Sequence, residues 1–251
     1  LKASGVKPGD KVAVTSFSFI ASATAIMNAG AIPVFLDIDD HYCTDSSTLL
    51  SLIRRREVSA IVAVHLYGQM MALEQVYREA NSVGIVVIED AAQAFGATRN
   101  GVAPGTHSDL ACVSFDPTKL VSAYGSGGAV LCNNDELAER LKRLRYHGHS
   151  SNHVYTEVGH NSQLPSLQAA LLSLKLGYLE QWKSRRIEIA GSYLEAVSEV
   201  ECITPPKIAS GNEHTFHKYV LTVPGKRDEL AVFLGERGVS TAIHYKLPLY
   251  K

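Results

Sequence analysis

The sequence predicts an α/β protein with a mostly parallel central sheet flanked by helices, followed by a smaller α+β domain at the C-terminal end. Two observations predict this fold class. Short apolar runs rich in Val, Ile and Ala alternate with helical patterns as far as Arg145, which is typical of parallel sheets covered on both faces. After Cys202–Pro206 the pattern changes to strand, helix and strand, which indicates a second unit.

The strands and helices of the large domain are expected from their periodicity and their flanking residues. Strands are bounded by Gly, Pro or Asp, and we expect them at Lys11–Val14, Pro33–Leu36, Ala60–Val64, Ile85–Glu89, Leu110–Phe115 and Gly128–Cys132. Helices are expected at Phe19–Asn28, Ser46–Arg56, Ala72–Val83 and Asp135–Arg145. Ala29-Gly30 suits the end of the first helix, and Asp135 can cap the start of the last.

A long amphipathic helix is expected at Gln163–Trp182, and a second helix follows near Arg185–Val200. The small domain is then expected to form a strand, a helix and a strand, at His217–Val223, Arg227–Arg237 and Ser240–His244. We place the boundary at residue 180, which divides the chain into a large α/β domain (1–180) and a small α+β domain (181–251).

Composition narrows the class of protein. The chain has 251 residues, of which 46% are hydrophobic, and a formal net charge of -1, so it offers no electrostatic footprint for nucleic acid or an anionic membrane. No apolar run is long enough to span a bilayer, and no signal-peptide pattern is present. The four cysteines show no paired spacing, which favours reduced thiols and a cytoplasmic location.

The two ends of the chain indicate a fragment of a longer protein. It starts at Leu1 without an initiator Met and stops directly after a Pro-containing run. We therefore expect the large domain to be truncated at its N-terminus and the small domain to be incomplete.

Lys119 lies just past an apolar strand, among residues that form tight turns. Pro117 stops the strand, and a glycine-rich run, Gly125–Gly128, follows. A lysine at such a place can be desolvated, which lowers its pKa and frees its amine for imine chemistry. On this stretch alone, a surface lysine in a loop is the favoured alternative.

Asp90 favours a cofactor-binding role for Lys119 over that of a surface lysine. It ends an apolar strand, and ligand-binding residues of α/β sheets gather at the carboxyl ends of the strands. Alone, Asp90 is slightly better explained as a helix N-cap. Together with Lys119 and the glycine-rich run, it meets the needs of a pyridoxal phosphate site: a lysine for the imine, a carboxylate for the pyridine nitrogen, and donors for the phosphate.

The sequence resembles the DegT-type aminotransferases, which are pyridoxal phosphate (PLP)-dependent enzymes of fold type I that act on nucleotide-linked keto sugars. The resemblance covers nearly the whole chain. Its motifs appear in the family's order, at His65–Gly68, Glu89–Ala94, Pro104–Thr106, Ser114–Lys119, Gly125–Gly128, Arg145–Gly148, Gly159–Asn161 and Leu167–Ala170. Each motif is weak, but this many in order are specific.

The resemblance implies a role for each matching residue. Lys119 corresponds to the catalytic lysine that forms the imine with PLP and later moves a proton. Asp90 corresponds to the acid that pairs with the pyridine nitrogen. Gln93 corresponds to a residue near the cofactor ring, and Ser114 to a hydroxyl donor to the phosphate.

Other matches depend more on the resemblance. Phe19 corresponds to an aromatic residue stacked on the ring, although a core Phe at a helix start fits nearly as well. Asn161 corresponds to an asparagine that reaches the phosphate of a neighbouring subunit's cofactor, which implies a homodimer with a shared site. His65, Tyr67 and His147 are candidate substrate residues, and His65 is equally well explained as a hydrogen-bonded histidine at a strand end.

The chain also departs from the family. A Ser-Gly-Thr phosphate segment is missing, and Gln163 stands where many members have arginine. Phe95 and Asp116 stand where the branch acting on 3-keto sugars often has His and Tyr. These two residues therefore leave the sugar that the pocket binds unassigned. His147, His149 and His153 match no metal-ligand spacing, and we expect no metal.

By this resemblance, the chain transfers an amino group from an amino acid, glutamate or glutamine, to a nucleotide-linked keto sugar and so forms an amino sugar. No nucleic acid or membrane partner is expected. One alternative is a PLP-binding regulatory protein without turnover, and another is an unrelated α/β binding domain. A third is a sugar dehydratase on the same scaffold, against which Lys119 argues because family dehydratases have histidine there.

Overall fold

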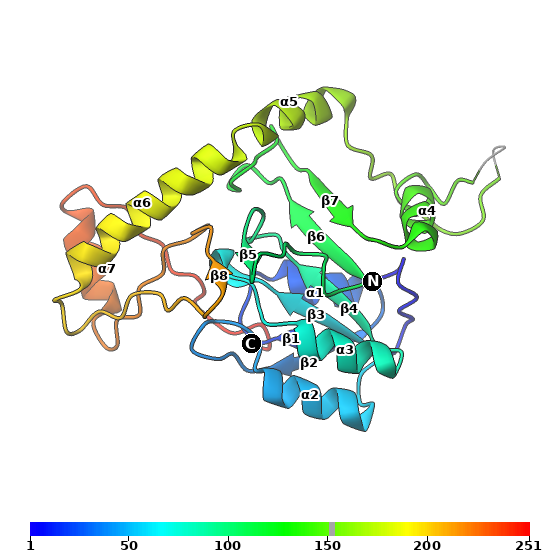
Figure 1. The fold of residues 1–251 in the computed structure, drawn as a ribbon, viewed down its shortest axis with the longest axis horizontal. Coiled ribbons are helices and arrows are strands. Elements are labelled where there is room, and N and C mark those ends of the chain that lie inside the picture. Colours follow the sequence, from blue (N-terminus) through cyan, green and yellow to red (C-terminus); the bar gives the residue numbers. More distant parts are fainter. Residues whose placement is uncertain (151–153) are drawn as a thin grey trace.

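A six-stranded sheet forms the centre of the protein in the computed structural model, which describes residues 1–150 and 154–251 (Figure 1). Its order is β2-β1-β3-β4-β6-β7, and only the last pair, β6 and β7, is antiparallel. This confirms the predicted mostly parallel sheet. The strands span Lys11–Thr15 (β1), Ile32–Leu36 (β2), Ala60–Val64 (β3), Val86–Asp90 (β4), Leu110–Ser114 (β6) and Gly128–Leu131 (β7).

Helices cover both faces of the sheet. They span Ala21–Asn28 (α1), Ser46–Arg55 (α2), Glu74–Ser82 (α3) and Asp135–Leu144 (α4), close to the predicted ranges. Asn134, and not Asp135 as predicted, caps α4, because its side chain accepts a hydrogen bond from Leu137 N. Asp135 instead lies in the first turn, where its charge favours the helix dipole.

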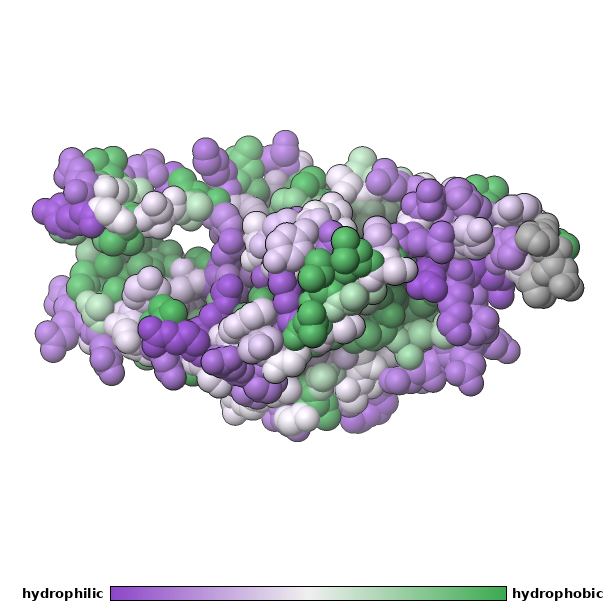
Figure 2. All heavy atoms as spheres, turned by 90° about the horizontal axis from the view of Figure 1, so that it is seen from above, coloured by the Kyte–Doolittle hydropathy of each residue, from purple (hydrophilic) through white to green (hydrophobic). Residues whose placement is uncertain are grey.

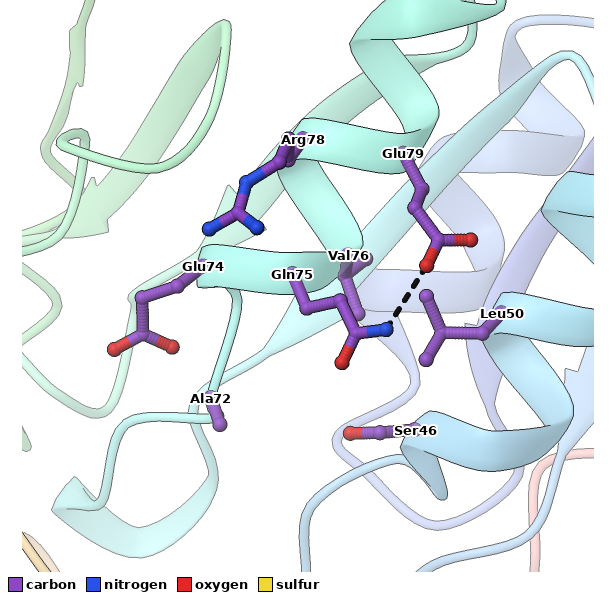
Figure 3. A pocket seen from close by; sticks show the side chains of 8 residues that line it. All are labelled: Ser46, Leu50, Ala72, Glu74, Gln75, Val76, Arg78 and Glu79. Atoms are coloured by element: carbon purple, nitrogen blue, oxygen red, sulfur yellow. Dashed lines mark hydrogen bonds between the residues drawn. The ribbon is translucent and has the colours of Figure 1, made fainter.

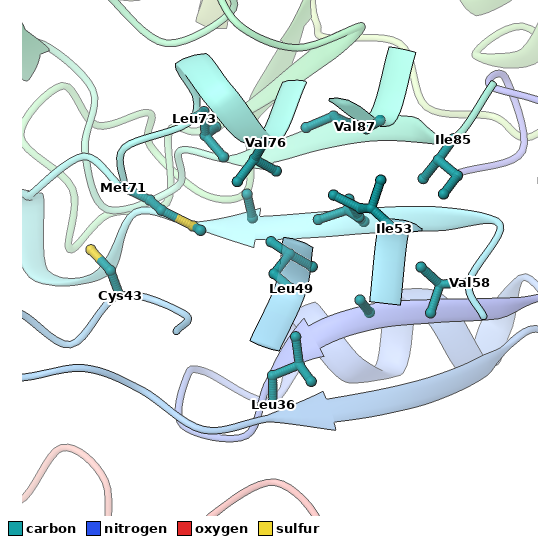
Figure 4. Packing of buried hydrophobic residues seen from close by; sticks show 14 residues of the cluster. Leu36, Cys43, Leu49, Ile53, Val58, Met71, Leu73, Val76, Ile85 and Val87 are labelled. Carbon is teal, nitrogen blue, oxygen red and sulfur yellow. The ribbon is translucent and has the colours of Figure 1, made fainter. Parts of the chain in front are cut away.

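The core explains why these strands are almost uniformly apolar. On one face, Leu49 and Ile53 of α2 and Val76 of α3 pack over Ile61 and Val87 (Figure 4). On the other face, alternate residues of the same strands, including Val12, Val14 and Val62, pack with Ile26 of α1. Since successive side chains of a strand point to opposite faces, a sheet covered on both faces needs apolar residues at every position.

Two helices replace the single helix predicted at Gln163–Trp182, so that prediction is wrong. They are α5 (Ser166–Leu176) and α6 (Leu179–Val197), which also contains most of the predicted Arg185–Val200. The break lies at Gly177-Tyr178, where the backbone N–H groups bond three residues back. The apolar pattern runs through the break because Leu172 and Leu179 pack into the same cluster.

The C-terminal part has little regular structure besides α7 (Arg227–Gly235). The strands predicted at His217–Val223 and Ser240–His244 are wrong: within these two ranges, all of which the structure describes, the only β pairing is the single bridge of Thr222 with Thr204. A strand needs a partner along its length, and the backbone here bonds elsewhere, as Lys218 N does to Tyr67 O. The domain boundary proposed at residue 180 falls at the start of α6 and stays a prediction.

A two-stranded sheet joins the C-terminal part to the large domain. It pairs β5 (Thr98–Arg99) with β8 (Asn212–Glu213), and a short 3-10 helix, η1 (Leu66–Gly68), contacts the same C-terminal segment. In the described parts of the chain, no helix combines the length and the apolar character needed to cross a membrane.

Candidate active site

The candidate site lies where two neighbouring parallel strands end. Asp90 is the last residue of β4, Ser114 is the last residue of β6, and Lys119 follows in the loop after β6. Because parallel strands end at the same edge of a sheet, the fold brings these residues together. The carboxylate of Asp90 acts electrostatically on the amine of Lys119.

A tight turn holds Lys119 above this edge. The backbone N–H of Lys119 donates to the carbonyl of Asp116 at 2.9 Å, and Asp116 Oδ1 accepts from Thr118 N at 3.0 Å. The side chain is half-buried, and this burial lowers the pKa of the Lys119 amine, although Asp116 and Asp90 oppose the change. A lowered pKa makes the neutral, nucleophilic amine more available.

Asp90 is anchored by a residue that sequence reasoning missed. Its Oδ2 accepts a hydrogen bond from the buried Ser22 Oγ at 2.7 Å, and its Oδ1 accepts from Ala92 N at 3.2 Å. The next element after β4 is a strand, β5, so Asp90 caps no helix. Ser22 belongs to α1, 68 residues away in the sequence, and no spacing could have linked the two.

Gln93 joins two segments beside Asp90. Its Oε1 accepts from Tyr67 N at 3.0 Å, and its Nε2 donates to the hydroxyl of Tyr245 at 3.0 Å. Tyr67 is itself buried, with its hydroxyl donating to the carbonyl of His244. The C-terminal residues His244 and Tyr245 therefore reach the site, which the sequence did not indicate.

His65 lies behind the site. Its side chain is fully buried, Nδ1 accepts from Met71 N at 3.1 Å, and Nε2 lies 2.5 Å from Glu89 Oε2. Burial alone would raise the pKa of Glu89, but hydrogen bonds from His65 and Gly105 N hold it below its usual value. Since both ring nitrogens of His65 are occupied, this geometry favours the hydrogen-bonded alternative over contact with substrate.

The remaining predicted residues lie in exposed positions. Phe19 precedes α1 and is 56% exposed. Asn161 is exposed and forms a β-bridge with Tyr146, on the segment between α4 and α5. His147, also exposed, is on the same segment, whereas His153 lies outside the described residues.

Three cations, Lys119, Lys218 and Arg186, lie around His217 of the C-terminal part, which sequence reasoning also missed. Burial, with the charges of Lys119, Lys218 and Arg186, lowers the pKa of His217 to about 3. His217 is therefore neutral at physiological pH. Arg186 Nη1 donates to the carbonyl of Phe216 at 3.0 Å and so fixes the backbone beside His217.

The donor set at this edge fits pyridoxal phosphate. Asp90 supplies an anchored carboxylate for a ring nitrogen, and Lys119 supplies an amine with a lowered pKa. Ser114 Oγ accepts a hydrogen bond from Asp116 N at 3.2 Å, which leaves its proton available for a phosphate oxygen. Among the described residues, no group of three or more His, Cys, Asp or Glu side chains could hold a metal ion.

A separate cavity of about 490 Å³ lies between α2 and α3 (Figure 3). Its lining residues are Ser46, Leu50, Ala72, Glu74, Gln75, Val76, Arg78 and Glu79. The Glu79 carboxylate accepts two hydrogen bonds from Arg54 at 2.8 Å and one from Gln75 at 2.9 Å. This carboxylate is therefore already paired, and the cavity includes none of the predicted site residues.

Comparisons with known proteins match the chain to one family over its whole length. Residues 1–251 match the family model described as the DegT/DnrJ/EryC1/StrS aminotransferase family. The chain is 42% identical over 252 residues to a "Pleiotropic regulatory protein" of Geobacillus stearothermophilus, with 100% of this chain and 68% of the relative covered. It is 38% identical over 256 residues to "dTDP-3-amino-3,4,6-trideoxy-alpha-D-glucose transaminase" of Micromonospora megalomicea subsp. nigra, with the same coverage.

Solved structures show the same fold. The crystal structure of S. venezuelae DesV in complex with a ketimine intermediate superposes with a TM-score of 0.94 at 35% identity, covering 100% of this chain and 67% of DesV. An aminotransferase of this family from Brucella abortus gives a TM-score of 0.92 at 32% identity, covering 100% and 68%. The chain spans about two thirds of the length of these relatives.

Proposed function

Because the chain belongs to the DegT/DnrJ/EryC1/StrS aminotransferase family, a family of PLP-dependent enzymes, we propose that it moves an amino group from glutamate or glutamine to a nucleotide-linked keto sugar. The names of several relatives support a nucleotide-linked substrate, since they are transaminases of dTDP- and UDP-linked sugars. The product would be an amino sugar.

The observation that carries this proposal is the placement of Lys119 and Asp90 at the ends of adjacent strands. Bound pyridoxal phosphate supplies an electron sink for the carbanion that forms when the substrate loses its α-proton. Lys119 would hold the cofactor covalently and then, as a free amine, carry that proton as general base and acid. Asp90, kept in place by Ser22, would hold a proton on the ring nitrogen.

Neighbouring groups would orient the cofactor. Ser114 would donate its hydroxyl proton to the phosphate, next to the turn at Gly125–Gly128. Gln93, held by Tyr67 and Tyr245, would contact the ring or its phenolic oxygen. Phe19 is exposed beside α1, where it remains available to stack on the ring.

A second copy of the chain would complete the site through Asn161. Apolar side chains stay exposed on α5, among them Leu167 and Leu174. Figure 2 shows an apolar area near the middle of the face seen from above. Exposed apolar patches are typical of protein–protein contacts, which supports a homodimer in which Asn161 reaches the partner's cofactor phosphate.

Replacing Lys119 by Ala tests the proposed chemistry. The variant is expected to lose the visible absorbance of lysine-bound pyridoxal phosphate and to lose turnover, because Lys119 supplies the amine that forms the imine and carries the proton. Absorbance spectra and formation of the keto acid from glutamate measure the two effects. Lys142→Ala on α4, which removes an exposed lysine paired with Glu139, is the matched control. Retention of both signals in Lys119→Ala would contradict the proposal.

The regulatory protein among the relatives supports one competing function, a protein that binds pyridoxal phosphate without turnover. The two functions give different results when the protein is incubated with pyridoxal phosphate, glutamate or glutamine, and a panel of nucleotide keto sugars. An aminotransferase yields an amino sugar that mass spectrometry identifies. The regulatory protein yields the cofactor spectrum and no keto acid.

A further inference from the structure

A fully buried pair of titratable side chains lies directly behind the candidate site. His65 follows β3 and Glu89 is in β4, and their side chains are 0% and 1% exposed. His65 Nε2 and Glu89 Oε2 are 2.5 Å apart. Neither residue takes part in the proposed chemistry, and burying a carboxylate is costly unless it is hydrogen-bonded. The burial of this pair therefore calls for a structural or functional explanation.

The hydrogen bonds of this pair converge on the carboxylate of Glu89. Met71 N can only donate, and it donates to His65 Nδ1 at 3.1 Å, so the ring proton sits on Nε2 and points to Glu89. At the other end Gly105 N donates to Glu89 Oε1 at 2.8 Å. Met71 N and Gly105 N both donate, one through the His65 ring and one directly, so Glu89 must accept a hydrogen bond at each of its two oxygens. Only a carboxylate accepts at both. An amide at position 89 would leave one donor facing another donor.

The same pair is connected to the proposed cofactor residues. The backbone N–H of His65 donates to the carbonyl of Asp90 at 3.0 Å. Because neighbouring residues of a strand point to opposite faces, holding the Glu89 side chain fixes the direction of Asp90. The bond from Met71 to His65 also closes the loop that contains Tyr67, whose N–H binds Gln93 at 3.0 Å.

We propose that the His65–Glu89 pair is a positioning element that holds Asp90 and Gln93 in the orientation that binds the cofactor. This inference rests on the proposed function, because it takes Asp90 and Gln93 as cofactor residues. It predicts that breaking the pair weakens cofactor binding in a protein that is still folded.

The test compares two conservative variants of the pair. Glu89→Gln is expected to raise the dissociation constant for pyridoxal phosphate at least about tenfold, because one buried donor loses its acceptor. His65→Gln keeps an acceptor at one end and a donor at the other, and is expected to stay within about threefold of the unmodified protein. Titration of the apo-protein with pyridoxal phosphate, followed by visible absorbance, measures both constants, and thermal unfolding of the apo-protein is recorded in parallel.

A merely structural role gives a different result. Leu49→Ala on α2 removes a buried core side chain that takes no part in the hydrogen bonds of the pair, and it is the control for loss of stability alone. If Glu89→Gln lowers the unfolding temperature as Leu49→Ala does and leaves the dissociation constant unchanged, the inference is wrong. If Glu89→Gln does not fold, Glu89→Asp takes its place, since it keeps the charge but shortens the reach to Gly105 or His65.

The unmodified protein separates this inference from the proposed function. If it binds pyridoxal phosphate through Lys119 and Glu89→Gln binds it equally well, only the positioning role fails. If the unmodified protein does not bind pyridoxal phosphate, the proposed function fails and the inference fails with it.

Discussion

At the scale of single residues, burial decides the charge of two histidines in the C-terminal part. His214 is 5% exposed, and its Nδ1 accepts a hydrogen bond from Phe216 N at 2.8 Å. Burial lowers the pKa of His214 to about 4. His217 is similarly affected, with its pKa lowered to about 3. In the unfolded chain these histidines are not buried, so their pKa values are not lowered. As the pH falls, they are therefore protonated in the unfolded state before they are protonated in the folded state.

We expect His214 to make the fold sensitive to mild acid. Between pH 6.5 and pH 4 the unfolded chain binds a proton at His214 that the folded chain does not, so stability falls as the pH falls through this window. The loss of stability that His214 alone causes between pH 7 and pH 5 is about 2 kcal/mol. Urea unfolding at the two pH values is expected to show a smaller loss in His214→Gln.

The exposed His160 supplies the control for this experiment. His160→Gln is expected to lose as much stability between pH 7 and pH 5 as the unmodified protein. The same loss in His214→Gln would mean that His214 is not the group that titrates.

At the scale of elements, the segment between α4 and α5 folds back on itself through its glycines. His147 N donates to the carbonyl of His160 at 2.9 Å, and Tyr146 pairs with Asn161. Gly148 has a φ of +77°, and a Cβ there would overlap the carbonyl of Glu157. Only glycine combines this positive φ with the absence of a Cβ. Gly148 therefore determines how closely the two sides of the segment approach, and this approach determines where Asn161 lies.

Replacing Gly148 by Ala is expected to open this segment without unfolding the sheet. Trypsin cleavage after the exposed Arg145 is expected to become at least about tenfold faster, because protease susceptibility follows local opening. Mass spectrometry of timed digests measures the rate. Gly225→Ala is the control, since Gly225 also has a positive φ but has open space around its Cβ position. Equal cleavage in the two variants would contradict this account.

At the scale of the whole molecule, the C-terminal part docks onto the large domain at several places, and at Gly68 the two backbones approach closely. Thr215 N donates to the carbonyl of Gly68 at 3.0 Å, and Lys218 N donates to the carbonyl of Tyr67 at 3.2 Å. Gly68 has a φ of +113°, and a Cβ there would lie 2.6 Å from Thr215 Oγ1 and 2.9 Å from Phe216 N. This contact brings His217 and Lys218 to Lys119.

We expect Gly68→Ala to destabilise the protein through both backbone strain and overlap. Gly84→Ala is the matched control, because Gly84 has a φ of +75° and nothing within 4 Å of its Cβ position. Gly68→Ala is expected to cost about 2 kcal/mol more free energy of unfolding than Gly84→Ala. Urea unfolding measures the difference, and equal values would show that the close approach is not needed.

Local chemistry explains which elements could be predicted from the sequence. The strand at Ala60–Val64 was predicted with the bounds it has, because a β-branched run between turn residues is determined by its own side chains. The helix break at Gly177 was missed because the apolar period continues across it. The strands predicted at His217–Val223 and Ser240–His244 failed because strand formation depends on a partner elsewhere in the chain.

The sequence by itself determined the mostly parallel sheet, the family, and the placement of Asp90 at the end of one strand and Lys119 just past another, because each is carried by short local patterns and their order along the chain. Only the tertiary structure decided which groups meet there. Ser22 reaches Asp90 across 68 residues, and Tyr245 reaches Gln93 across 152. His65 and Glu89 are 24 residues apart and are buried together only because β3 and β4 pair. Hydrogen-bond partners of this kind are set by how strands and loops pack, which no local pattern records.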